Sequence, residues 1–315
     1  MGGGPGQGAF AVQVRGHDIK LGDTLTIELT AGDRSGKVAT ADVRSIDASL
    51  GQTRIEGATG KQKLANTRLN QVYENQTLKQ IVSDLASQAG VTAGDLDTGS
   101  SYSCLVVHES RNLLNHIGEL ARRDGLDAYF DQENKLTLKK FNKLSADHTF
   151  FYGIDVLDLQ MRTHQPVSDH LIVYGESPAS NQGKDTWHWL AKDLSPFRGE
   201  VGKGLNTLAI ADGALRTKDA AANLASSKFG AIKDYSTRGK LKILGNPQVR
   251  LGDAIEIKQA PKPELNGLFK VVSVRHVLNK HAGYLTFIGF SGQGGAATAA
   301  DLLGQVGQLA GALGL

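Results

Sequence analysis

This sequence of 315 residues has a single cysteine, no long apolar run and little excess of either charge. Because Cys104 has no second cysteine to pair with, no disulfide can form within the chain, and nothing indicates an oxidising compartment. No stretch approaches the roughly 18 apolar residues of a membrane-spanning helix, so we expect no membrane insertion. The start, MGGGPGQGAF, lacks the basic and apolar parts of a secretory signal peptide, and we therefore expect synthesis in the cytoplasm.

The charges of the chain are nearly balanced. There are 35 Lys and Arg against 32 Asp and Glu, a net charge of +3, and the two signs alternate along most of the sequence. A protein that binds nucleic acid usually gathers basic residues on one face. The sequence therefore predicts no nucleic-acid partner. With 40% hydrophobic and 21% charged residues, the composition is typical of a soluble folded protein of two or three domains.

One pattern does occur twice. Residues 19–29 read IKLGDTLTIEL, and residues 249–259 read VRLGDAIEIKQ. Each copy joins a Gly-Asp turn to a strand of alternating apolar and polar residues, and a hairpin follows each copy. The repeat predicts two related β-barrels, with Gly22 and Gly252 in a backbone conformation of positive φ. Convergence of two turns on the same residue types is the alternative explanation.

The two hairpins that follow can be aligned as well. Val43 and Arg44 in the first match Val274 and Arg275 in the second, with one small gap before the final strands. In those strands Gly57 matches Gly289. This longer match favours a true repeat over convergence.

Between the two copies, the period of the apolar residues changes. In residues 75–90 and 111–125 they recur every three or four positions and a glycine follows, which predicts two helices. Residues 126–141 predict a hairpin with its turn at 132–134. Further on, HLIVYGES predicts a strand and TKDAAANLASSKFG predicts a helix. The stretch RGEVGKGLN (198–206) fails the spacing of a phosphate-binding loop and is expected to be a flexible loop.

These patterns predict a mixed α+β chain that is rich in β-structure. Two similar β-barrel domains in tandem are separated by a small α/β insert and followed by a short apolar C-terminal tail. The expected ranges are a flexible N-terminus (1–9), a first barrel (10–70), the insert (71–149), a second barrel domain with one helix (150–292), and a Gly/Ala linker with the tail (293–315). Since few residues precede the first strand, the first barrel could be abbreviated or completed by a neighbouring chain.

No group of residues predicts catalysis or a metal site. His276 and His281 flank a turn but lack a third ligand at a recognised spacing; we expect His276 to bond at a strand end and His281 to lie in a loop. Other candidates also lack such a spacing: the cluster His164, Asp169 and His170, and the pairs Glu109/Glu119 and Asp155/Asp158. Cys104 is expected to be buried, and Trp187 and Trp189 fit a core better than a sugar-binding platform, although a contact between subunits fits too. We expect no enzyme activity, no metal and no cofactor.

Five phrases occur in a fixed order along the chain. They are KLGDTLTIEL, YENQTLKQIVSDLASQAG, ESRNLLNHIGELARRDGLDAYFDQENKLTL, ALRTKDAAANLA, and LGDAIEI with LNGLFKVVSVRHVLNKHAGYLTFIGF. In this order they resemble the late control protein D family, the baseplate hub proteins of contractile phage tails. The chain is similar in the same way to the N-terminal hub part of type VI secretion spike proteins. The resemblance covers residues 15–292.

The resemblance implies a structural protein that forms a homotrimeric ring at the end of the tail tube and adapts the six-fold tube to the three-fold spike. Two barrels per chain would give a trimer six similar units. The implied partners are the tail tube protein, a separate trimeric spike protein and other baseplate proteins. The implied location is a phage tail baseplate or injection particle, after synthesis in the bacterial cytoplasm. The alternative is a cell-wall-degrading enzyme or a glycan-binding component of the same particle.

The tail carries the candidate partner-binding residues. Leu302, Val306, Leu309 and Leu313 recur at 4-3-4 spacing, the pattern of a helix seam. The glycines of the same segment each cost about 1 kcal/mol of helicity relative to Ala. We therefore expect the segment to fold only against a partner such as the spike, a tube component or a neighbouring hub chain; a disordered terminus is the alternative.

Overall fold

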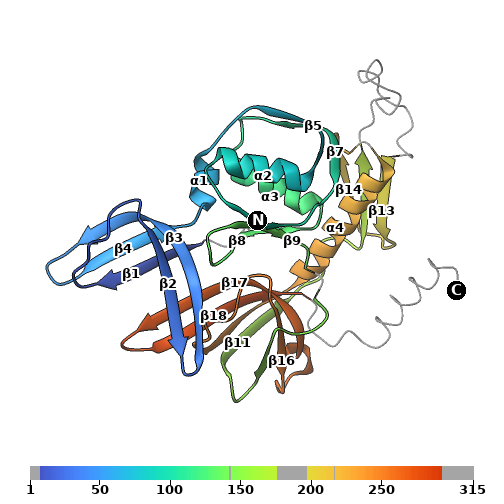
Figure 1. Cartoon of the computed structure of the whole chain (residues 1–315). Coiled ribbons are helices and arrows are strands. Elements are labelled where there is room, and N and C mark those ends of the chain that lie inside the picture. Colours follow the sequence, from blue (N-terminus) through green and yellow to red (C-terminus); the bar gives the residue numbers. More distant parts are fainter. Residues whose placement is uncertain (1–7, 142, 176–196, 216, 293–315) are drawn as a thin grey trace. The chain divides into compact units, whose positions relative to one another are not determined.

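The computed structural model describes residues 8–141, 143–175, 197–215 and 217–292 (Figure 1). The chain divides into two compact units: unit 1 comprises Met1–Phe141 and Pro166–Ile232, and unit 2 comprises Asn142–Gln165 and Lys233–Leu315. This division differs from the expected ranges, because residues 166–232 group with the N-terminal part of the chain. The ion pair between Arg123 and Asp212, at 3.0 Å, is one contact that joins the two stretches of unit 1.

The first sheet of unit 1 has four antiparallel strands in the order β1-β4-β3-β2. They are β1 (Ala9–Val14), β2 (Thr24–Ala31), β3 (Arg34–Ala48) and β4 (Thr53–Ala58). In β2 the exposure of the side chains alternates with their polarity, because one face of the strand points toward a core. That core is small, and its buried members are Phe10, Ala41, Val43 and Ile55.

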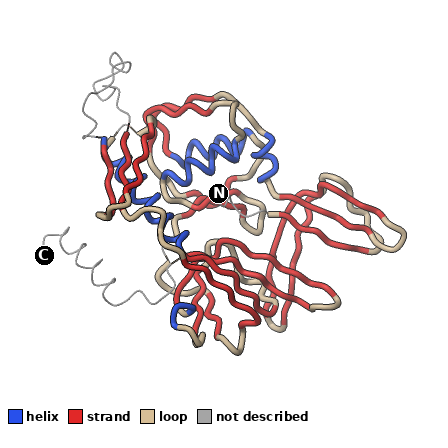
Figure 2. The backbone as a smooth tube through the Cα atoms, turned by 180° about the vertical axis from the view of Figure 1, so that it is seen from behind, coloured by secondary structure: helices blue, strands red, loops and turns tan. Residues whose placement is uncertain are grey.

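An α/β part with a larger core follows in unit 1. Its elements are α1 (Lys61–Asn66), β5 (Gln71–Thr77), α2 (Leu78–Gln88), β6 (Ala93–Leu96), β7 (Ser101–Val107), α3 (Leu113–Arg123), β8 (Asp127–Phe130) and β9 (Leu136–Lys139). Figure 2 shows α2 and α3 in blue between two groups of red strands. The two predicted helices are confirmed: Thr77 and Gln80 form a capping box at the start of α2, and the Asn112 side chain caps α3. The predicted hairpin turn is confirmed as well, with Asn134 at φ +63°.

A three-stranded sheet, in the order β13-β12-β14, and the helix that covers it complete unit 1. The strands are β12 (His170–Gly175), β13 (Arg198–Gly202) and β14 (Thr207–Asp212), and the helix is α4 (Lys218–Ser236), whose last residues belong to unit 2. The expectation of a flexible loop at 198–206 is wrong, because residues 198–202 form β13. Gly199 lets this strand approach the α4 backbone at Ala221, where a Cβ atom would collide.

Unit 2 contains one six-stranded sheet in the order β10-β16-β17-β18-β15-β11. Its elements are β10 (His148–Phe151), β11 (Val156–Thr163), β15 (Thr237–Leu244), β16 (Ala254–Lys258), the 3-10 helix η4 (Pro263–Leu265), β17 (Gly267–Asn279) and β18 (Gly283–Ser291). The rings of Phe269 and Phe290 pack in its core with their centroids 4.7 Å apart. Among the residues that the structure describes, no helix combines the length and the apolarity that a membrane span requires.

Candidate functional site

The first copy of the repeated turn lies at the start of β2. Gly22 adopts φ +90°, as predicted, and its amide donates to the Val43 carbonyl at 3.0 Å. The Val43 amide donates back to the Asp23 carbonyl at 2.8 Å, so the turn is joined to β3 by two hydrogen bonds. The Asp23 carboxylate accepts from the Lys20 amide at 2.8 Å and closes the turn.

The second copy at the start of β16 has the same set of bonds. Gly252 adopts φ +79°, and its amide donates to the Val271 carbonyl at 3.0 Å. The Val271 amide donates to the Asp253 carbonyl at 2.8 Å, and the Asp253 carboxylate accepts from the Arg250 amide, also at 2.8 Å. Each turn needs a glycine in the left-handed conformation, followed by an aspartate whose carboxylate closes the turn. This requirement explains why both copies contain Gly-Asp.

The strands around the two turns also correspond. The order β1-β4-β3-β2 in unit 1 matches β15-β18-β17-β16 in unit 2, and every neighbouring pair is antiparallel. The first sheet has a bulge between Val43 and Ser45, and the second has one between Val271 and Ser273. A bulge at the same place in both sheets is a specific shared feature, because it redirects the strand and increases its twist.

This correspondence corrects the alignment made from the sequence. Because Val43 and Val271 bond to the same turn, Val43 corresponds to Val271 and not to Val274. In the partner strands, Gly57 pairs with Val43 while Phe290 pairs with Val271, so Gly57 corresponds to Phe290 and not to Gly289. The matching Val-Arg letters occupy different positions relative to the bulge, and hydrogen bonds fix the true register.

The two sheets differ at their edges. In unit 2, β10 pairs with β16 and β11 pairs with β15, so both sides of the shared four-strand frame are flanked. In the described part of unit 1, the corresponding edges of β2 and β1 have no further strand. Phe150 of β10 is 4% exposed in the core of unit 2, where Ile257 is 1% exposed. Ile27 of the first sheet, which corresponds to Ile257, is only half-buried.

Polar contacts hold β10 in place in unit 2. The imidazole of His148 lies 3.1 Å from the carboxylate of Asp253, and Lys143 lies 2.6 Å from Asp147 and 3.4 Å from Asp253. The Asp147 carboxylate also accepts from the Ala254 amide at 2.8 Å. The aspartate of the second Leu-Gly-Asp turn therefore closes its turn and anchors the flanking strand.

The histidines considered as ligands have structural partners. His276 Nδ1 lies 2.9 Å from the Tyr284 hydroxyl and 3.2 Å from the Thr286 hydroxyl, and burial lowers the pKa of His276 to about 4. The imidazole is therefore neutral at pH 7. His281 is exposed in the turn, where its amide donates to Asn279 Oδ1 at 3.0 Å. Within the described ranges, no three His, Cys, Asp or Glu side chains are grouped to hold a metal ion.

The second candidate cluster is also structural. His170 Nε2 lies 2.7 Å from Glu200 on β13, and its Nδ1 lies 2.9 Å from the Thr207 hydroxyl on β14, so it bridges the strands on both sides of β12. The Asp169 carboxylate accepts from the Asn206 amide at 2.8 Å. His164 belongs to unit 2, whereas Asp169 and His170 belong to unit 1.

Three of the four carboxylates in the candidate pairs make structural contacts, whereas Glu109 is exposed and bonds through its backbone amide, which donates to Asn70 Oδ1 at 3.0 Å. Glu119 binds Arg111 and Arg123, and Asp155 accepts from the Phe151 amide at 2.8 Å in the turn after β10. Asp158 accepts from the Gln160 side chain at 3.3 Å. Cys104, which was expected to be buried, is half-buried. The remaining predicted residues lie outside the described ranges: Trp187, Trp189, Leu302, Val306, Leu309 and Leu313.

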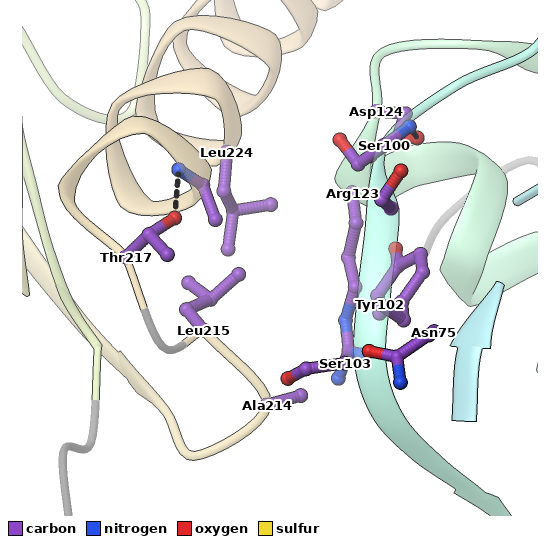
Figure 3. A pocket seen from close by; sticks show the side chains of 12 residues that line it. Asn75, Ser100, Tyr102, Ser103, Arg123, Asp124, Ala214, Leu215, Thr217 and Leu224 are labelled. Atoms are coloured by element: carbon purple, nitrogen blue, oxygen red, sulfur yellow. Dashed lines mark hydrogen bonds between the residues drawn. The ribbon is translucent and has the colours of Figure 1, made fainter. Parts of the chain in front are cut away.

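One cleft in unit 1 was not foreseen from the sequence (Figure 3). It has a volume of about 300 Å³, and Tyr102 and Arg123 line one side while Leu215 and Leu224 line the other. The Arg123 guanidinium is paired with Asp212 at 3.0 Å, and burial raises the pKa of the Tyr102 phenol. The dashed bond in Figure 3 joins the Thr217 hydroxyl to the Ala220 amide and caps α4. The cleft unites segments more than 80 residues apart, so no local sequence signal could have found it.

Within the described ranges, the charged groups of this cleft are bonded to other groups of the chain. Catalysis by a nucleophile needs a side chain within hydrogen-bond reach of a base that is itself oriented by a third group. Asp124 accepts from the Ser100 amide, which ties the carboxylate to the backbone and not to a hydroxyl nucleophile. The Arg123 charge is already balanced by Asp212 and Glu119.

The fold has known counterparts among solved structures. The 43 kDa tail protein of prophage MuSo2 from Shewanella oneidensis matches with a TM-score of 0.66 and 14% identity, over 90% of each chain. A tail protein from Neisseria meningitidis MC58 matches with a TM-score of 0.66 and 10% identity, over 91% of this chain and 88% of its own. The chain has the fold of phage tail proteins.

A component of the E. coli type VI secretion system matches as well, with a TM-score of 0.57 and 12% identity, over 90% of this chain and 69% of its own. That protein is itself described as structurally similar to the bacteriophage T4 tail proteins gp27 and gp5. No family model and no curated protein matches the sequence. At identities this low the likeness lies in the fold, and at that level it confirms the resemblance to phage tail proteins.

Proposed function

We propose that this chain is a structural, non-enzymatic hub protein in the baseplate of a contractile phage tail or a related injection particle. The observation that carries the proposal is the four-strand frame that occurs twice, with the same turn, strand order and bulge. The likeness of the fold to phage tail proteins over nine tenths of the chain supports the same role.

In this proposal the hub is a homotrimer. Two equivalent sheets in one chain provide two similar docking units, and three chains about one axis provide six. A trimer of this kind can contact a six-fold tail tube through its six sheets and a three-fold spike through its three chains. The two tandem sheets are then the tube-like barrels of the hub.

The edges of β1 and β2, which no other described strand flanks, support an assembly between chains. An exposed edge strand carries unpaired backbone N–H and C=O groups, and these pair readily with a strand of another chain. The half-buried Leu25 and Ile27 on β2 would gain burial in such a contact. The other proposed partners are a tail tube protein, a separate spike protein and other baseplate proteins, with Leu302, Val306, Leu309 and Leu313 as a docking segment for one of them.

The mass of the assembled hub tests this proposal. Native mass spectrometry of the purified chain, alone and with its tube protein, should give a complex that contains three copies. A hexamer or a persistent monomer in both samples would contradict the symmetry argument. Release of peptidoglycan fragments by the purified chain would contradict the non-enzymatic role.

A further inference from the structure

The outward face of the sheet in unit 2 is strongly basic. The strand registers place three neighbouring rows on this face: Asp158, Lys242, Phe287 and Arg275; then Gln160, Lys240, Gly289 and Ser273; then Arg162, Arg238 and Ser291. Their neighbours along β15, Leu241 and Ile243, point into the core. Residues 162, 238, 240, 242 and 275 are named here the basic face.

The cations of the basic face lack acidic partners. None of the five has a carboxylate within ion-pair distance among the residues that the structure describes. Arg238 lies over the ring of Tyr235 at 4.1 Å, while Arg275 and Lys242 flank the Phe287 ring at 4.6 and 5.8 Å. These aromatic contacts hold the side chains on the face, where Asp158, opposite Lys242, is the one carboxylate of the three rows.

The matching face of the first sheet has a different charge. Through the shared register, Arg238, Lys240 and Lys242 correspond to Ala9, Ala11 and Gln13. By the same register, Arg275 corresponds to Asp47. Since the first sheet forms without these cations, the four-strand frame does not need them. The basic face is therefore a property of unit 2 alone.

The chemistry of this face favours a polyanion over a protein partner. Side chains opposite one another on neighbouring strands lie about 5 Å apart, so like charges there repel unless a counter-charge is present. The centre of a protein–protein interface is usually apolar and depleted of charge. In the three rows described here, Phe287 is the single large apolar side chain. Gly289 and Ser273 in the middle row have small side chains and leave space above the sheet.

We propose that the basic face binds the phosphate backbone of nucleic acid without reading base sequence. Alternate residues along β15 repeat every 6 to 7 Å or so, which suits an extended chain of phosphates that carries one charge per 3.4 Å of each strand. Base edges are read by elements that enter a groove of the duplex, whereas Lys and Arg on the broad face of a six-stranded sheet reach the phosphates. The proposal does not depend on the hub assignment. It replaces the expectation of no nucleic-acid partner, which rested on the charge balance and on the alternation of signs along the sequence. Neither of these shows how neighbouring strands gather charges on one face.

Fluorescence anisotropy of a labelled 30-base-pair DNA of mixed sequence, titrated with the full chain, tests the proposal. Five phosphate contacts predict that log K falls with log salt with a slope of about −4.5. The variant K240Q/K242Q/R275Q should reduce the slope to about −2 and weaken binding about a hundredfold at 0.1 M salt. A second DNA of unrelated sequence should bind equally well.

A matched control removes three exposed cations elsewhere, K20Q/K79Q/K203Q, and should leave both the affinity and the slope near those of the parent chain. The single variants K240Q and R275Q, which change the chain least, should each reduce the magnitude of the slope by about 0.9. Equal weakening by the control triple, or no binding at 50 mM salt, would overturn the proposal. Poly-glutamate serves as a second competitor. If it displaces the labelled DNA at a lower concentration of charged groups than unlabelled DNA does, the partner is an acidic protein and the nucleic-acid proposal is overturned.

Discussion

The two four-strand frames of this chain share their hydrogen bonds but differ in what surrounds them. In both frames the Leu-Gly-Asp turn is hydrogen-bonded to the next strand, β3 or β17, and that strand has a bulge at the same position. Around the second frame, β10 and β11 add strands and Phe150 adds a core side chain. The first frame has a core of four buried residues, and no further strand flanks its two edges in the described part of the chain. A sheet can therefore keep its frame while its flanks and its outward charges change.

The largest effect is expected at the strand that only the second frame has. Phe150→Ala should destabilise unit 2 by about 3 to 5 kcal/mol, because it removes a buried ring and loosens β10. The same type of change in the first frame, Phe10→Ala, should cost about 2 kcal/mol, because that small core relaxes more easily. Hydrogen exchange measured separately on β16–β17 and β2–β3 reports each sheet. Equal losses in both would contradict the idea that flanking strands set the stability of the second sheet.

The twin turns provide a comparison at matched positions. Gly252→Val should cost about 1 to 3 kcal/mol, since φ +79° is strained for a β-branched residue and the turn also positions Asp253 against His148. Gly22→Val meets the same backbone strain but no flanking strand, and its cost should fall at the lower end of that range. Asn at either position should cost less, because Asn tolerates positive φ. Melting temperatures unchanged in both Val variants would contradict the paired-turn interpretation.

His276 should make the second sheet sensitive to acid. Its folded pKa of about 4 lies below the ordinary value of 6.5, so the unfolded chain binds the proton first as pH falls. The contribution is therefore fully present above about pH 6.5 and is lost as the pH falls toward 4. We expect a loss of about 1 to 2 kcal/mol, less than the full shift implies because the ring is partly exposed. His276→Gln should flatten the pH dependence of unit 2 unfolding between pH 4.5 and 7, and an unchanged profile would contradict this assignment.

The smallest effect on folding is expected at the C-terminal segment. Deleting residues 296–315 should leave the unfolding of both sheets unchanged, because the last strand of the sheet, β18, ends at Ser291. The deletion should nevertheless lower the yield of assembled particles if Leu302, Val306, Leu309 and Leu313 dock on a partner. Replacing these four residues by Ser should reproduce the loss, and replacing the glycines at 304 and 307 by Ala is the control. A normal particle count with the deletion would exclude docking.

Local chemistry made part of this structure predictable. The Gly-Asp turns were recognised because the conformation of Gly22 and Gly252 depends on adjacent residues, and α2 and α3 were recognised from a period that one helix face imposes. The strand β13 was missed, because its glycines were interpreted as flexible and not as contact points for α4. The basic face was missed because its cations come from β11, β15 and β17, and only the strand register brings them together.

The interleaving of the two units has a consequence for synthesis on the ribosome. The strands β10 and β11 leave the ribosome early, but their partners β16 and β15 follow only after residues 166–232 have been made. At ordinary translation rates of about 5 to 20 residues per second, synthesis of this stretch takes roughly 3 to 13 seconds. The last strand, β18, lies in the middle of the sheet and joins β17 to β15. A chain interrupted before Gly283 would hold two separate half-sheets with exposed edges, and translation through Ser291 is needed before unit 2 can become continuous.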